Sequence, residues 1–237
     1  MPTKALSARV KPIQLAGQPA MSVAIELQAE RAPRRHAFYL RALAVFYPAT
    51  KERCSEALRL FERAIGIGRH YGPALASAAF CHMVLDLNGW AEEPEPTRRK
   101  AEDLARRALQ AAQNDPRILA NTASALAYCG EDIGAMMALA DRALAINPSY
   151  VRGWYLSGVI RLWGGQLDLV IEHIETALRL SPREYLGLPL HVAGMAYFFK
   201  GNAVAPVHPR ASGAMPAHTE ALPRAMPTWD ASMKRAK

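Results

Sequence analysis

Apolar residues recur every three or four positions between residues 36 and 200, and short breaks containing Gly, Pro, Asn or Asp separate the runs. Positions i, i+3, i+4 and i+7 share one helix face, so this spacing predicts amphipathic helices. Leu and Ala dominate while aromatic residues make up only 8% of the chain, which favours helices over a β-sandwich. We predict helices over 36–47, 50–66, 73–87, 97–112, 116–129, 132–146, 149–163, 167–180 and 187–200.

Three kinds of residue recur along these helices at nearly constant intervals. Small residues are spaced by 44, 35 and 34 positions, turn glycines by 35 and 36, and helix-flanking prolines by 32 and 34. The residues concerned are Ala64, Ala108, Ala143 and Ala177, then Gly130, Gly165 and Gly201, then Pro116, Pro148 and Pro182. A period near 34 with two helices per unit predicts a right-handed α-solenoid, whose units bury their apolar faces only against their neighbours.

The clearest unit runs over residues 150–182. Trp154 and Gly158 share one face of its first helix, and Gly158 allows the second helix to approach closely. Gly165 suits a left-handed turn between the helices, and Pro182 ends the second helix. The second helix carries an apolar stripe at Val170, Ile174 and Ala177.

This unit resembles the tetratricopeptide repeat, whose pattern is W-x2-L-G-x2-Y, then A-x3-F, then P. Trp154, Gly158, Ala177 and Pro182 match that pattern. The departures from it are Ser157, Arg161, Val170 and Ile174, where the family has Leu, Tyr, Ala and Phe. The resemblance implies an all-α solenoid of antiparallel helix pairs, about four and a half repeats over 36–200, that acts as a non-catalytic scaffold for protein–protein interaction.

In tetratricopeptide arrays the first helices line a concave groove that takes partner peptides. The resemblance then implies a partner-binding face at Arg117, Asn121, Arg152, Tyr155, Val159, Leu162, His191 and Met195. This mixture of apolar side chains and a few cations suits an extended or helical peptide with some acidic character. The other interpretation is that Tyr155, Leu162 and Trp163 only pack between neighbouring units. The family's carboxylate clamp needs a defined set of Lys, Asn and Arg residues across neighbouring units. Only Arg117 and Asn121 resemble members of that set, so no clamp is predicted.

Three short strings, YLRA at 39–42, NGW at 88–90 and LAYCGEDIGA at 126–135, support a narrower resemblance. Together they resemble the C-terminal repeat regions of bacterial class III adenylate/guanylate cyclases. That likeness implies an alternative function, a detached or truncated regulatory region of a bacterial signalling protein. No catalytic domain is included, so no catalytic residue carries over.

The net charge of +8 belongs mainly to the two ends of the chain. Residues 1–36 carry +4 and residues 201–237 carry +3, which leaves +1 for 37–200. A groove that tracks phosphates carries its charge on the folded face, so we expect no nucleic-acid partner. No uncharged stretch reaches the roughly 18–20 residues that a bilayer requires, so we also expect no membrane span.

Motifs for chemistry are missing from the sequence. It holds no G-x-x-x-x-G-K-[ST], G-x-S-x-G or H-E-x-x-H pattern. We expect no enzymatic activity, no metal and no cofactor. Cys54, Cys81 and Cys129 form no C-x-x-C pair, and we predict free thiols in a reducing cytoplasm. His173, beside two glutamates on a repeat helix, is expected at the surface.

The remaining segments are expected to lie outside the repeats. An insertion around 87–100, which includes Trp90, is predicted to form a solvated loop. We expect residues 1–35 to be a flexible basic segment and residues 201–237, with five prolines, to be disordered. The abrupt change near 201 leaves Phe198 and Phe199 without a covering helix, which predicts self-association and suggests a truncated or frameshifted repeat array.

Overall fold

The structure, a computed structural model, describes residues 32–47, 49–182 and 187–201. Within those ranges it contains nine helices and no strand. The helices are α2 (Arg34–Phe46), α3 (Lys51–Ile67), α4 (Gly72–Leu87), α5 (Pro94–Ala111), α6 (Pro116–Tyr128), α7 (Ile133–Ile146), α8 (Val151–Trp163), α9 (Leu167–Leu180) and α10 (Gly187–Phe199). Every predicted helix is found, with ends that differ from the prediction by three residues or fewer.

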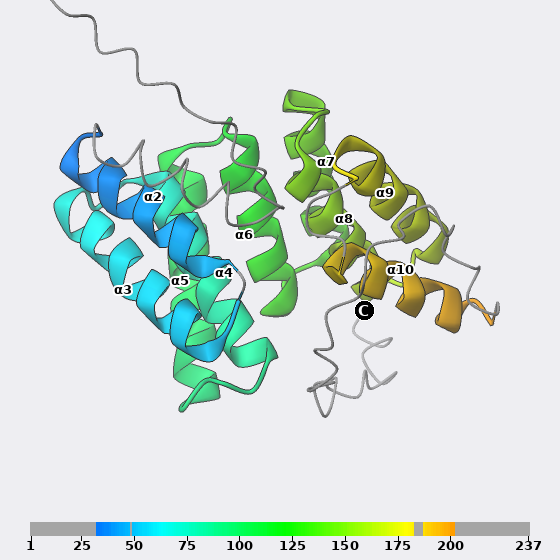
Figure 1. The fold of residues 1–237 in the computed structure, drawn as a ribbon, viewed down its shortest axis with the longest axis horizontal. Helices are drawn as coiled ribbons and strands as arrows, with labels where there is room; N and C mark the ends of the chain where they lie inside the picture. Colours follow the sequence, from blue (N-terminus) through cyan, green and yellow to red (C-terminus); the bar gives the residue numbers. More distant parts are fainter. Residues whose placement is uncertain (1–31, 48, 183–186, 202–237) are drawn as a thin grey trace, which may run out of the picture.

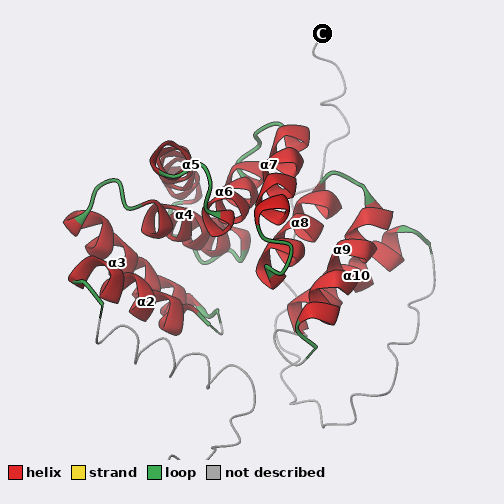
Figure 2. Cartoon of the chain, turned by 90° about the horizontal axis from the view of Figure 1, so that it is seen from above, coloured by secondary structure: helices red, strands yellow, loops and turns green. Residues whose placement is uncertain are grey.

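Consecutive helices pack as pairs, α2 with α3, α4 with α5, α6 with α7 and α8 with α9 (Figure 1). The first helices of successive pairs also contact one another in series, from α4 through α6 and α8 to α10. Seen from above, the helices form an arch, with α2 and α3 at one side and α9 and α10 at the other (Figure 2). The predicted all-α helical-repeat solenoid is confirmed.

The recurring small residues lie where the second helix of each pair meets the core. Ala64, Ala108 and Ala143 have no exposed surface, and Ala177 is 2% exposed. At Gly158 an added Cβ atom would lie 2.8 Å from Cδ1 of Ile174, so α8 and α9 approach as closely as the sequence predicted.

The glycines predicted at the turns after first helices adopt a left-handed backbone. Gly130, Gly165 and Gly201 have φ values of +95°, +72° and +71°. The structure adds Gly89, at +67°, in the turn after α4. Residues other than glycine rarely adopt this conformation, so these positions fix where α4, α6, α8 and α10 end.

The predicted loop at 87–100 is wrong for its second half. Helix α5 begins at Pro94, because prolines at 94 and 96 fit the first turn, whose N–H groups need no helical partner. Part of the insertion lengthens this helix, which has 18 residues against 14 for α7 and for α9, and part lengthens α4, which has 16 residues against 13 for α6 and for α8. Only 88–93 form a connection, and Trp90 in it is half-buried against the core.

Two departures from the repeat pattern contact each other. The buried guanidinium of Arg161 donates to the hydroxyl of Ser157, one helical turn earlier in α8. It also binds Asp141 of α7 through Nη2, at 2.7 and 2.9 Å from the two carboxylate oxygens. The polar pair therefore links α8 to the preceding unit where the family pattern places Leu and Tyr.

The expected surface position of His173 is wrong. Its side chain is buried, with 7% of the residue exposed, and its ring lies 4.8 Å from that of Trp154, edge to face. The apolar stripe of α9 is therefore wider than the pattern of Val170, Ile174 and Ala177 indicated, because the histidine ring joins it.

The predicted ends of the chain fall almost wholly outside the described residues. Of the predicted flexible segment 1–35 only residues 32–35 are described, and α2 already begins at Arg34. Of the predicted tail 201–237 only Gly201 is described, so the predicted truncation near 201 also lies outside the described residues. Among the described helices, none has both the length and the apolar character needed to cross a membrane.

Candidate functional site

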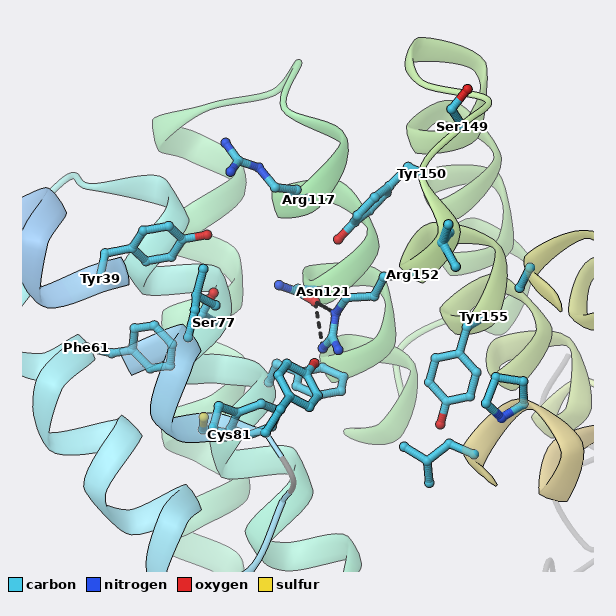
Figure 3. Close-up of a pocket in the computed structure, with 18 of the residues that line it drawn as sticks. Tyr39, Phe61, Ser77, Cys81, Arg117, Asn121, Ser149, Tyr150, Arg152 and Tyr155 are labelled. Atoms are coloured by element: carbon cyan, nitrogen blue, oxygen red, sulfur yellow. Dashed lines mark hydrogen bonds between the residues drawn. The ribbon is translucent and has the colours of Figure 1, made fainter. Parts of the chain in front are cut away.

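A cavity of about 410 Å³ opens on the inner side of the arch (Figure 3). Both sides of the arch and the first helices between them contribute to its wall. The lining residues are Tyr39, Leu43, Phe46, Tyr47, Phe61, Ser77, Phe80, Cys81, Arg117, Asn121, Ser149, Tyr150, Val151, Arg152, Tyr155, Ala177, Leu178, Leu188 and Pro189. Most of this wall is aromatic or aliphatic.

Packed aromatic rings form the α2–α4 side of the cavity. The ring of Phe46 lies 6.0 Å from that of Phe80, edge to face, and the ring of Tyr39 lies 5.9 Å from that of Phe61. Tyr39, Phe46, Phe61 and Phe80 are each less than 8% exposed. Because these side chains are fixed by the core beneath them, the wall is formed before any ligand arrives.

Arg152 of α8 enters the cavity from the opposite side. Its guanidinium carbon lies 4.5 Å from the ring centre of Phe80 and 5.3 Å from that of Tyr47. Its Nε and Nη2 atoms each donate to Oδ1 of Asn121 at 3.3 Å. These contacts join residues of α4, α6 and α8, so they orient a cation inside an apolar wall.

Arg117 is the second cation of the lining and lies at the start of α6. Its Nη2 atom is 3.0 Å from Oδ2 of Asp115, and its backbone N–H donates to Oδ1 of the same carboxylate at 2.9 Å. Asp115 is thus the N-cap of α6 as well as an ion-pair partner. The hydrogen bond and nearby charge of Asp115 raise the pKa of Arg117, so this side chain is always charged.

Tyrosine hydroxyls supply further polar atoms. Burial raises the pKa of Tyr39, Tyr150 and Tyr155. The nearby charge of Arg117 offsets this rise only in part at Tyr39 and Tyr150, and that of Arg152 only in part at Tyr155. These hydroxyls therefore stay protonated and act as neutral donors. Burial also raises the pKa of the Cys81 thiol well above its ordinary range, which leaves it protonated and a poor nucleophile.

The eight residues predicted for the binding face divide into two groups. Arg117, Asn121, Arg152 and Tyr155 line the cavity. The other four do not: Leu162 is buried between α8, α9 and α10, Val159 and Met195 pack against that cluster, and His191 is exposed on α10. For Leu162 the packing interpretation is therefore the better one, and Trp163 likewise packs against Tyr128, 6.2 Å between ring centres.

Several lining residues were not predicted from the sequence. Leu43, Phe46 and Tyr47 lie on or just after α2, whose unit carries no Trp–Gly signature to mark it as a first helix. Leu178 and Leu188 come from the other side of the arch. The aromatic spacing in 36–47 was the available signal for α2, whereas no local pattern shows that α9 reaches the same cavity.

Groups suited to metal binding are not assembled in this part of the chain. Among the residues that the structure describes, no three His, Cys, Asp or Glu side chains lie close enough to hold a metal ion. Cys54, Cys81 and Cys129 are free thiols.

The arrangement defines the class of protein: a helical-repeat solenoid with a pre-formed, largely apolar cavity on its concave side. The chain matches no protein-family model and no curated protein. It is similar to the solved structure of TTC0263, a thermophilic TPR protein of Thermus thermophilus, with 17% identity and a TM-score of 0.56 over 75% of this chain and 90% of that one. This likeness shows the tetratricopeptide fold.

Two further solved structures are similar with lower scores. YrrB, a TPR protein with an unusual peptide-binding site, shares 18% identity over 79% of this chain and 87% of that one, with a TM-score of 0.42. MamA shares 18% identity over 64% of this chain and 81% of that one, with a TM-score of 0.44.

Proposed function

We propose that this protein is a non-catalytic interaction module that binds a partner peptide in the concave cavity. The observation that carries the proposal is the cavity itself, which has a fixed aromatic wall and a few oriented polar groups. Pre-formed apolar clefts with few polar groups are the usual form of ligand sites. Its lining comes mainly from first helices, the helices that face partners in the tetratricopeptide fold.

A peptide-display selection tests this proposal. The chain is immobilised, a library of random twelve-residue peptides is selected on it, and the dissociation constants of the enriched peptides are measured. Leu188→Glu is the site variant, because Leu188 lines the cavity yet is 53% exposed, so the substitution leaves the core intact. Ile146→Glu is the matched control, since Ile146 is 43% exposed on α7 and lies outside the lining.

We expect Leu188→Glu to weaken the enriched peptides at least about tenfold, because a carboxylate at the mouth must be desolvated against the apolar peptide surface. The control variant should bind within about twofold of the wild type. Equal loss in both variants, or no loss in either, overturns the cavity as the binding site.

A second surface, the outer face of α10, supports the prediction of self-association. Phe198 and Phe199 are 74% and 56% exposed, and 187–199 carry no Asp, Glu, Lys or Arg. We propose that a second copy covers this face, since two uncharged faces meet without like-charge repulsion.

The regulatory role in a cyclase-like bacterial signalling protein stays an alternative, supported by the three short strings at 39–42, 88–90 and 126–135. Reading the DNA on both sides of this reading frame tests this alternative, and a cyclase domain encoded alongside would favour it.

A protein rather than a nucleic-acid partner is supported by the near-neutral charge of 37–200. DNA or RNA binding that weakens with salt and persists without the basic ends would overturn that preference.

A further inference from the structure

Several apolar side chains of the concave cavity are in contact with water. Leu188 is 53% exposed, and Leu43 and Tyr155 are only partly buried. Apolar surface of this kind in a groove marks an interaction site. A segment that covers these side chains gains free energy by removing them, and its own apolar side chains, from water.

The chain contains a segment of suitable composition just before α2. Residues 21–27 read MSVAIEL, in which the large apolar residues Met21, Val23, Ile25 and Leu27 alternate with small or polar ones. Such alternation places the apolar side chains of a peptide on one face when the peptide binds in an extended form. The segment after α10 is less suitable, because residues 202–237 contain a single leucine and no Ile, Phe or Tyr.

The covalent connection to α2 brings this segment within reach of the cavity. Helix α2 begins at Arg34, and Tyr39 of the cavity lining lies about 7.5 Å further along the same helix. Ala32 packs against the same core cluster as Tyr39. The five residues from Leu27 to Ala32 span at most about 18 Å, and residues 21–27 span at most about 20 Å more. The segment is therefore long enough to enter the cavity from the start of α2 and to run along it.

We propose that residues 21–27 occupy the concave cavity of their own chain and compete there with the partner peptide. The competition rests on the proposed function and adds regulation to it. A tethered segment acts at an effective concentration of about 1 mM, so a weak intrinsic affinity is enough to keep it bound most of the time. The partner then binds only those molecules whose cavity is free of the segment, and its apparent affinity falls in proportion.

Crosslinking from the segment tests its position without any partner. Benzoylphenylalanine is incorporated at position 25 of the full chain, the protein is irradiated, and the crosslinked residues are identified by mass spectrometry. Position 13 is the matched control, because Ile13 also precedes α2 and, like Ile25, is followed two positions later by a leucine.

We expect position 25 to crosslink within one chain to cavity residues such as Leu43, Phe80 and Leu178, and position 13 to crosslink to them much less. Equal crosslinking from both positions, or no crosslink from position 25 to the cavity, overturns the proposal. Crosslinks to the cavity that join two chains overturn it as well, because they assign the cavity to the segment of a second copy.

Charged variants of the full chain test the competition. Ile25→Asp with Leu27→Asp places two carboxylates in the segment, and Ile13→Asp with Leu15→Asp makes the same two substitutions at the same spacing outside it. The probes are library peptides that lose affinity for Leu188→Glu. We expect the first variant to bind them about tenfold more tightly than the wild type, as for a segment bound about nine-tenths of the time. The control should stay within about twofold.

The two experiments separate this proposal from the proposed function. Peptide affinities that do not change in Ile25→Asp with Leu27→Asp refute the competition and leave the peptide site standing. Cavity crosslinks from position 25, with no cavity-binding peptide selected on the wild type or on that variant, refute the proposed function and leave the segment as the ligand of the cavity.

Discussion

Replacing Gly158 by Ala tests whether the close crossing of α8 and α9 sets the geometry of the repeat. In an exposed helix interior, alanine is more favourable than glycine by about 1 kcal/mol. At Gly158 the new Cβ would lie 2.8 Å from Cδ1 and 3.1 Å from Cγ1 of Ile174, well inside the roughly 3.5–4.0 Å of a favourable carbon contact. Ile174 has no exposed surface, so its side chain cannot turn away into solvent.

The steric cost therefore exceeds the gain in helix propensity. Overpacking a well-packed core costs about 1–3 kcal/mol, so the net change is a destabilisation of about 1 kcal/mol. For a chain of this size that corresponds to a fall in Tm of about 2–4 °C. Urea unfolding and thermal unfolding, both followed by circular dichroism, measure the change.

Gly194→Ala is the matched control, because nothing lies within 4 Å of a Cβ atom added there in α10. It should stabilise the protein by about 0.5–1 kcal/mol. Ile174→Val removes the closest clashing atom, so its cost should be smaller in the Gly158→Ala background than in the wild type. If Gly158→Ala stabilises the protein as much as the control does, the close approach of the two helices is refuted.

Three other predictions concern a polar pair, a buried histidine and the end of the arch. Arg161→Met should lower the free energy of unfolding by about 2 kcal/mol, since the contacts with Asp141 and Ser157 are lost; an unchanged urea midpoint contradicts this. Burial, aided by Lys100 and opposed by Glu62, lowers the pKa of His82 from 6.5 to about 4, so the folded state resists its protonation. The free energy of unfolding has its full value above pH 6.5 and decreases by about 3 kcal/mol between pH 6.5 and about 4. His82→Leu should remove this decrease, and a pH profile of stability identical to that of the wild type would contradict the assignment. Phe198→Ser with Phe199→Ser should shift light scattering towards the monomer, and an unchanged distribution refutes α10 as the contact.

Local signals in the sequence were sufficient for the helices and their turns. Prolines at first-turn positions and glycines with left-handed backbones determine where helices begin and end, and these effects act over a few residues. The same prolines explain the error at 94–100, because the two prolines just before the predicted start were interpreted as a loop although they fit a first turn.

The cavity depends on contacts that no local pattern contains. Leu43 and Leu178 are 135 positions apart and line the same space only because the stacked units curve into an arch. The burial of His173 has a similar cause, since the ring that covers it belongs to Trp154 on the neighbouring helix. The four predicted residues that do line the cavity lie on α6 and α8, in the middle of the array.

The central claim is that a peptide occupies the concave cavity, and photocrosslinking tests it most directly. The bulky apolar residue of the tightest library peptide is replaced by benzoylphenylalanine, the complex is irradiated, and the crosslinked residues are identified by mass spectrometry. The account predicts crosslinks to cavity residues such as Leu43, Phe80, Tyr155 and Leu178. Crosslinks confined to the outer helices α5 and α7, or to Phe198 and Phe199, would contradict it.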